Sequence, residues 1–153
     1  MMNGRRVTEF LGVSTEPQRG VKEPVGPYEF FTETGVHVYL HDADFLGLAW
    51  QPDATLRLYF AHDPDWMPSG AEATPVVELT FSGVQVLEWE TDVEALSQTV
   101  PVLGQVSDFA WDGSDGFDLA TFTLNLSFSA PRMAVRLLPS APGELHQGEP
   151  PTR

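Results

Sequence analysis

The chain has 153 residues, enough for one domain with a substantial core, and a formal net charge of −14 from 22 acidic and 8 basic side chains. Because it contains no cysteine, disulfides, thiolate metal ligands and thiol nucleophiles are excluded. Nucleic acid is not expected as a partner, since phosphate binding depends on Lys and Arg, whereas a basic protein would be attracted. Alternatively, the acidity only keeps the protein soluble.

The two ends of the chain are predicted to differ from its middle. Residues 1–35 are rich in Pro and Gly and have only short apolar runs, so we expect an irregular segment that packs on the domain. Residues 139–153 have little to bury and predict a disordered tail. No secretory signal or bilayer-spanning stretch is evident, which predicts a cytoplasmic protein with no membrane contact.

Between these ends, at residues 36–138, apolar and polar side chains alternate with the period of a β-strand. The longest such run, Ala120–Phe128, predicts one half-buried antiparallel strand with Ala120, Phe122 and Leu124 pointing inward. The other alternating runs are Val36–Leu40, Leu56–Phe60, Val77–Phe81 and Met133–Leu137. The pattern therefore predicts an all-β domain.

Turn signals separate these strands. Ser82 and Gly83 predict a turn into a strand at Val84–Trp89, where a phase shift between Val86 and Leu87 indicates a β-bulge. A capping box, Thr91 with Glu94, predicts one short helix at residues 92–98. We expect seven or eight strands in an antiparallel β-sandwich or jelly-roll-like fold, with a barrel as the alternative.

A His-Asp dipeptide occurs twice, as His41-Asp42 and His62-Asp63. The apolar runs between the two copies meet at Pro52, which predicts a hairpin in which paired residue numbers sum to about 105. Asp42 would then lie near Asp63. Imidazole and carboxylate groups together can bind a divalent metal, so these four residues are a candidate metal site. Alternatively, all four are polar strand ends and turn caps.

Two further features contain residues that could bind a metal ion. His37 lies about 13 Å from His41 along an extended strand, too far for a shared ion, so we expect it beside Tyr39 at the surface. The segment from Asp112 to Asp118 has alternating oxygen side chains, but no glutamate at the twelfth position of a calcium loop. A hairpin turn is the expected structure there.

The loop that follows His62 carries Asp63, Asp65 and Trp66. A Trp surrounded by carboxylates is typical of a protein-contact anchor, and could also stack on a sugar. Alternatively, Trp66 folds back over the core. With Asp42, these three residues form the predicted partner-binding region.

The runs His41–Leu48, Leu56–Phe60 and Val77–Val84 together resemble small acidic β-proteins that act as immunity proteins in bacterial polymorphic toxin systems. The resemblance covers roughly residues 36–90. It implies a stoichiometric inhibitor that binds a cognate toxin, often over a basic active site. No functional residue is carried over from it.

No nucleophile elbow, phosphate loop, zinc-protease motif or dinucleotide fingerprint is present, so no catalytic residue is predicted. The sequence favours a non-catalytic module that binds a basic protein, without a cofactor. Two alternatives stay open: a metal-dependent enzyme that uses the paired His-Asp dipeptides, and a β-sandwich that binds carbohydrate or another small ligand.

Overall fold

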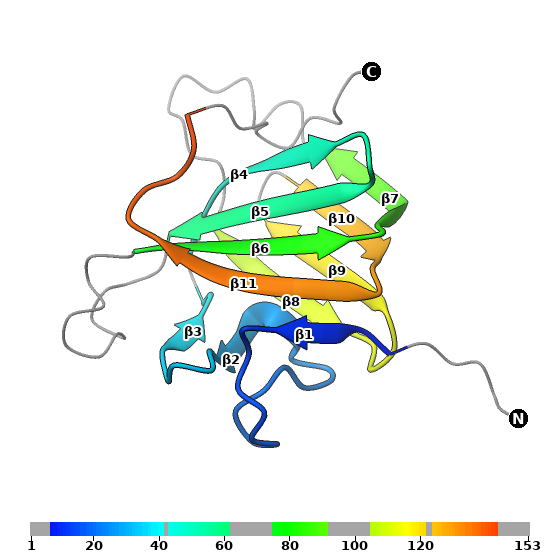
Figure 1. Cartoon of the computed structure of the whole chain (residues 1–153). Coiled ribbons are helices and arrows are strands. Elements are labelled where there is room, and N and C mark those ends of the chain that lie inside the picture. Colours follow the sequence, from blue (N-terminus) through cyan, green and yellow to red (C-terminus); the bar gives the residue numbers. More distant parts are fainter. Residues whose placement is uncertain (1–6, 42, 62–74, 92–104, 122–123, 144–153) are drawn as a thin grey trace, which may run out of the picture.

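The computed structural model describes residues 7–41, 43–61, 75–91, 105–121 and 124–143. Within them the chain forms short strands and one 3-10 helix (Figure 1). In chain order these are β1 (Glu9–Leu11), η1 (Gly26–Tyr28), β2 (Glu29–Phe31), β3 (His37–Tyr39), β4 (Asp44–Gln51), β5 (Thr55–Ala61), β6 (Val76–Ser82), β7 (Gln85–Thr91), β8 (Val106–Trp111), β9 (Gly116–Thr121), β10 (Leu124–Ser129) and β11 (Arg132–Leu138).

The strands form two large sheets that pack face to face, which confirms the predicted all-β, sandwich-like class (Figure 1). One sheet has the order β1-β11-β6-β5-β4, and the other has the order β7-β10-β9-β8. A third, two-stranded sheet joins β2 to β3. The described residues contain eleven strands, more than predicted, because β1 and β2 were not expected and the run Ala120–Phe128 is divided between β9 and β10. None of their helices could cross a membrane.

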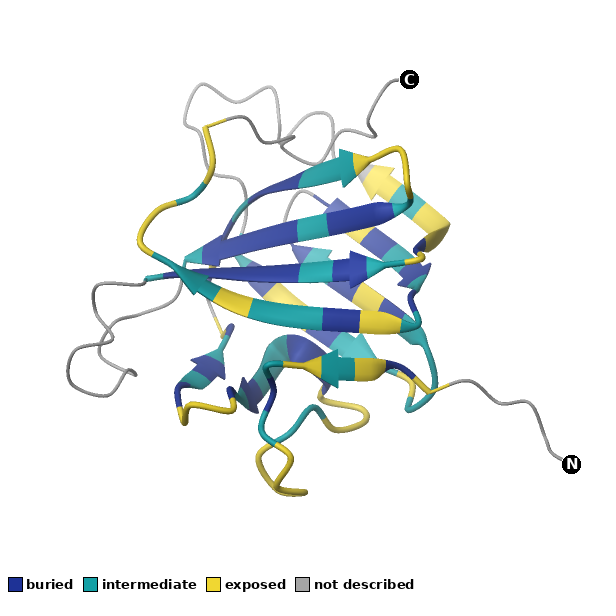
Figure 2. Ribbon diagram, viewed as in Figure 1, coloured by how far each residue is buried: buried dark blue, intermediate teal, exposed yellow. Residues whose placement is uncertain are grey.

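The core lies between the two large sheets, whose inner faces are buried (Figure 2). Phenylalanine rings from both sheets meet there: the Phe81 ring of β6 lies 4.8 Å from Phe128 of β10 and 5.1 Å from Phe117 of β9, between ring centroids. All three side chains are at most 1% exposed. Burying each such ring contributes roughly 1.5–3 kcal/mol, so this cluster is the main apolar link between the sheets.

The predicted hairpin around Pro52 is present as β4 and β5. Asp44 pairs with Ala61 and Phe45 with Phe60, so the paired numbers sum to the expected value at this end. A register shift between Phe45 and Gly47 changes the sum by one for the rest of the hairpin. Leu56, Leu58 and Phe60 point inward and are fully buried, as the period-two pattern predicted.

The prediction of one strand over Ala120–Phe128 is wrong. The strand β9 ends at Thr121, β10 begins at Leu124, and Ala120 pairs with Asn125 across an antiparallel hairpin. Alternation continues by chance through the reversal, so the period alone did not reveal the turn. Within β9 the phase is also reversed, because Thr121 is buried whereas Ala120 is partly exposed on the outer face.

The predicted bulge in β7 is confirmed. Glu88 pairs with Ser127 and Val86 with Phe128, so Leu87 is the extra residue that has no opposite partner on β10. Its side chain is 64% exposed, the highest value among the exposed large hydrophobic residues that the structure describes. The helix predicted at residues 92–98 lies outside the described residues.

The described part of the N-terminal segment, residues 7–35, packs along one side of the sandwich (Figure 1). The strand β1 pairs in parallel with β11, and the buried side chain of Phe30 joins the main core. The helix η1 lies against β8. Gly26 approaches the backbone of Phe109 and Trp111 so closely, with a φ of +66°, that a Cβ atom would collide with it.

Candidate functional site

Only one of the site residues predicted from sequence, His41, lies among the described residues, two positions after the end of β3. The other five are outside them: Asp42, His62, Asp63, Asp65 and Trp66. The register of β4 and β5 does bring the chain ends that lead to the two His-Asp dipeptides together, since Asp44 pairs with Ala61. The proposed convergence of the dipeptides therefore stays a prediction.

The His41 ring is held by a tyrosine. Its Nδ1 lies 2.7 Å from the Tyr28 hydroxyl oxygen, within hydrogen-bond distance. The same ring stacks on Tyr39, with centroids 5.6 Å apart and an interplanar angle of 16°. A metal at His41 would therefore either use Nε2 or displace Tyr28 from Nδ1.

His41 ends a row of stacked rings on the partly exposed face of β2 and β3. From Phe31 the row passes to His37, with centroids 4.5 Å apart, and then to Tyr39, 5.7 Å further. The Glu29 carboxylate lies 2.7 Å from Nε2 of His37, and the Arg19 guanidinium lies 4.7 Å from the Phe31 centroid. His37 lies beside Tyr39 as predicted, with its side chain 22% exposed. The contacts within the row fix the rings in place.

The described ranges contain no group of three or more His, Asp or Glu side chains that could hold a metal ion. The segment after β8 is the expected hairpin turn: the Asp112 carboxylate accepts hydrogen bonds from the backbone N–H groups of Ser114 and Gly116, at 2.7 and 3.1 Å. These bonds occupy one oxygen, Oδ1, in shaping the turn. Asp112 therefore has a structural role in the β8–β9 hairpin.

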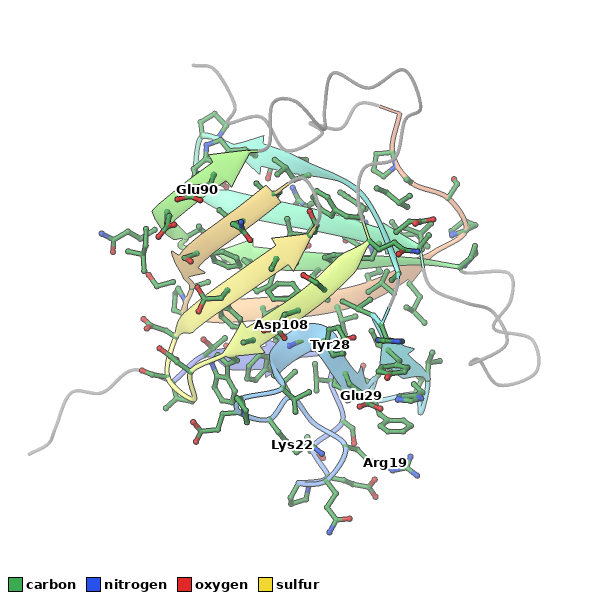
Figure 3. The ribbon with its side chains drawn as sticks, turned by 180° about the vertical axis from the view of Figure 1, so that it is seen from behind. Arg19, Lys22, Tyr28, Glu29, Glu90 and Asp108 are labelled. Atoms are coloured by element: carbon green, nitrogen blue, oxygen red, sulfur yellow. The ribbon has the colours of Figure 1, made fainter. Side chains whose placement is uncertain are left out.

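A further charged feature is the outer face of the four-stranded sheet, here called the acidic face (Figure 3). It carries four exposed acids: Glu88 and Glu90 on β7, Asp118 on β9, and Asp108 on β8. The strands that form it contain no Lys, Arg or His. Its charge is therefore not neutralised within the sheet.

The register shows how the acidic face is laid out. One row runs across the sheet from Glu88 through Ser127 to Asp118, and the next runs from Glu90 through Asn125 and Ala120 to Asp108. The residues between the acids are small or polar, so the surface has no bulky side chain at its centre. Neighbouring strands lie about 4.8 Å apart, which spaces the outer acids of each row by roughly 10–14 Å.

Repulsion within this face changes the titration of one acid. The pKa of Glu88 is raised above its ordinary value by its hydrogen bond to Glu90, by the charge of Glu90, and to a smaller degree by desolvation and then by the charge of Asp118. Asp118 is itself hydrogen-bonded by the Ser127 hydroxyl. Neighbouring carboxylates such as Glu88 and Glu90 favour either a proton or an incoming cation. The face is thus arranged to attract positive charge.

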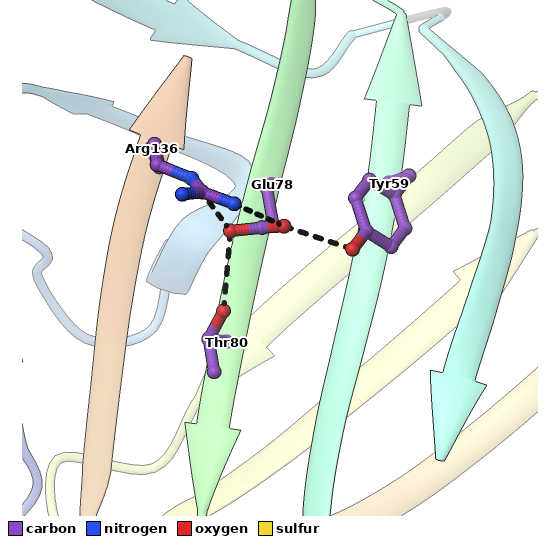
Figure 4. Close-up of polar contacts among 4 residues, drawn as sticks. All are labelled: Tyr59, Glu78, Thr80 and Arg136. Atoms are coloured by element: carbon purple, nitrogen blue, oxygen red, sulfur yellow. Dashed lines mark hydrogen bonds and ion pairs between the residues drawn. The ribbon is translucent and has the colours of Figure 1, made fainter. Parts of the chain in front are cut away.

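The outer face of the five-stranded sheet has a different arrangement (Figure 4). Glu78 on β6 is 5% exposed and accepts hydrogen bonds from the Tyr59 hydroxyl, at 2.8 Å, and from Nε and Nη2 of Arg136, at 3.1 and 3.2 Å. Burial, followed by the Glu78 hydrogen bond and charge, raises the pKa of Tyr59 to about 12. Both Glu78 oxygens have protein partners, so this cluster joins β5, β6 and β11.

Sequence reasoning missed the acidic face, although a signal for it exists. No Lys or Arg occurs between Arg57 and Arg132, and acids recur throughout that interval. All four strands of the four-stranded sheet lie within this interval. This long interval without Lys or Arg indicates a sheet whose negative charge is not compensated.

Comparisons of the chain with protein-family models, with curated proteins and with solved structures gave no match.

Proposed function

We propose that the chain is a non-catalytic, cytoplasmic protein-binding module that inhibits a basic partner protein, in the manner of an immunity protein of a bacterial toxin system. The observation that carries this proposal is the acidic face, on which Glu88, Glu90, Asp108 and Asp118 lie with no basic residue in the same strands. An uncompensated field of one sign attracts a partner of the opposite sign and raises the rate of association.

The shape of the acidic face also supports a protein partner. Ser127, Asn125 and Ala120 separate the acids, so a partner surface can approach the sheet closely. Arg and Lys side chains around the active site of the partner protein would meet carboxylates at regular spacings on this face. The stacked rings of β3 lie on a different sheet and contribute no charge of this kind.

The acidic loop residues predicted from sequence remain a second proposed contact region. They are Asp42, Asp63, Asp65 and Trp66. A test should therefore compare two sets of substitutions: Glu88→Gln with Glu90→Gln, Asp108→Asn and Asp118→Asn on the face, and Asp63→Asn with Asp65→Asn and Trp66→Ala on the loop.

The experiment is affinity capture from the producing cell, at low and high salt, followed by identification of the bound protein and measurement of its Kd. We expect one basic protein that is released by salt, because the interaction between exposed charges is screened. The face set should weaken this complex by at least about ten-fold, or about 1.4 kcal/mol. Capture of no specific basic protein, or unchanged affinity with both sets, would contradict the proposal.

A further inference from the structure

The two edges of the four-stranded sheet differ in how they are covered. Along β8, the backbone N–H of Trp111 donates to the carbonyl of Pro24, and η1 packs against the strand through Gly26. Along β7, the outer edge has no neighbouring strand among the described residues. Val86 and Leu87 are 37% and 64% exposed there. A strand at the edge of a sheet can accept another strand through the backbone groups on its outer side.

We propose that the basic partner binds by adding a strand to β7, an inference that rests on the proposed function. On β7, Glu88 and Glu90 face outward, and between them Trp89 packs against the core. An added strand in which Lys or Arg alternates with apolar residues would place cations beside the two glutamates and an apolar side chain beside Trp89. Cross-strand pairs of opposite charge stabilise such pairing.

The same residues argue against a second copy of this chain as the occupant. Two β7 strands paired edge to edge would bring four glutamates together, and like charges on neighbouring strands are destabilising. The bulge at Leu87 also shortens the regular edge to Glu88–Thr91. Bulges and charges on an edge limit indiscriminate pairing, so an occupant needs matching charge. This selects a basic, alternating segment.

The probe for the test is a capped peptide of about eight residues in which Lys and Val alternate. Two N-methylated forms accompany it, one methylated on the Val amides and one on the Lys amides. In an extended strand these two sets of N–H groups point to opposite edges, and only one edge can pair with β7. We expect one methylated form to bind at least about ten-fold more weakly than the parent peptide, and the other to bind like the parent.

A matched pair of double variants locates the contact. Glu88→Gln with Glu90→Gln removes two charges at the edge, and Asp108→Asn with Asp118→Asn removes two charges from the same face away from it. We expect the edge variant to weaken peptide binding by about ten-fold and the other by less than about three-fold. Circular dichroism of each variant checks that the fold is retained, and amide chemical shifts in the wild-type protein should change along β7.

Three results would overturn strand addition. The first is equal binding of the peptide and both methylated forms, the second is an equal effect of the two double variants, and the third is no binding of the peptide at low salt. Each of these leaves the proposed function to be decided by capture of the natural partner, because that experiment does not depend on how the partner binds. If capture succeeds while the peptide fails, the module binds a basic protein by side-chain contacts alone.

Discussion

The outer faces of the two large sheets differ in whether their acidic residues are paired with basic residues. On the five-stranded sheet, Glu78 is buried and paired with Arg136, and Glu9 on β1 is paired with Arg132 on β11 at 3.0 Å. On the four-stranded sheet, Glu88, Glu90, Asp108 and Asp118 are exposed without a basic residue in any of the four strands. On the first face Glu78 and Glu9 are paired with arginines within the fold, whereas the second face presents its four acids to solvent.

This difference separates acids that support the fold from acids that are available for binding. A buried carboxylate needs partners, because leaving it unpaired costs several kcal/mol. Exposed carboxylates add little to stability, and their mutual repulsion lowers it. Substitutions on the first face should therefore change stability, and substitutions on the second face should change partner binding.

The largest effect is expected for Glu78→Ala. The change leaves the Tyr59 hydroxyl buried without its acceptor and removes both bonds from Arg136, so the free energy of unfolding should fall by about 2–4 kcal/mol. Urea denaturation measures it. Glu78→Gln, which keeps the size and an acceptor, should lose less. A loss for Glu78→Ala below about 0.5 kcal/mol would show that the cluster does not stabilise the sheet.

The next effect is a dependence of stability on alkaline pH. Since the pKa of Tyr59 rises from 10.0 to about 12 in the folded protein, the unfolded chain releases this proton first. Stability from this group is complete below pH 10 and is lost as the pH rises toward 12, by about 2–3 kcal/mol in total. Tyr59→Phe should remove this part of the slope, and equal slopes for both proteins would contradict it.

A smaller effect is expected for Arg132→Gln. Its ion pair with Glu9 joins β1 to β11, but the two side chains are 56% and 58% exposed, so solvent screens the interaction. The free energy of unfolding should fall by less than about 1 kcal/mol, and the difference should vanish at high salt. A loss as large as that for Glu78→Ala would show that the two ion pairs are not distinguished by burial.

The smallest effect, and one of opposite sign, is expected for Glu88→Gln. Because neighbouring carboxylates raise the pKa of Glu88, wild-type stability decreases as the pH rises above the ordinary carboxyl range, and the variant should lose less. Thermal melts at neutral pH should show a slightly higher Tm for the variant. Glu33→Gln, at an exposed acid on the turn between β2 and β3, is the control and should not show this gain.

Much of the fold could be predicted from the sequence because its strands are half buried. Where one face meets the core, as at Leu56, Leu58 and Phe60, alternation identifies the strand and the side chains that face inward. The Leu87 bulge followed from the phase of this alternation, and the hairpin register at its Asp44–Ala61 end followed from the turn at Pro52. The reversal between Thr121 and Leu124 did not, because alternation happens to continue across it.

The candidate site was harder to predict because it depends on residues that are distant in sequence. Glu88, Asp108 and Asp118 belong to three strands, and only the order β7-β10-β9-β8 places them on one face. The Glu78 cluster likewise needs β5, β6 and β11 as neighbours. The stacking of His37, Tyr39 and His41 could have been predicted from the sequence, since alternate residues of an extended segment share a face.

The parallel pairing of β1 with β11 has a consequence for synthesis of the protein. Residues 9–11 can pair only after residues 132–134 have been synthesised. The ribosome must therefore complete nearly the whole domain before the largest sheet is fully formed. Until β11 emerges, β6 remains an open edge of the earlier three-stranded β4-β5-β6 meander. Such long-range closure predicts slow folding, and a nascent intermediate that is most vulnerable to aggregation at β6.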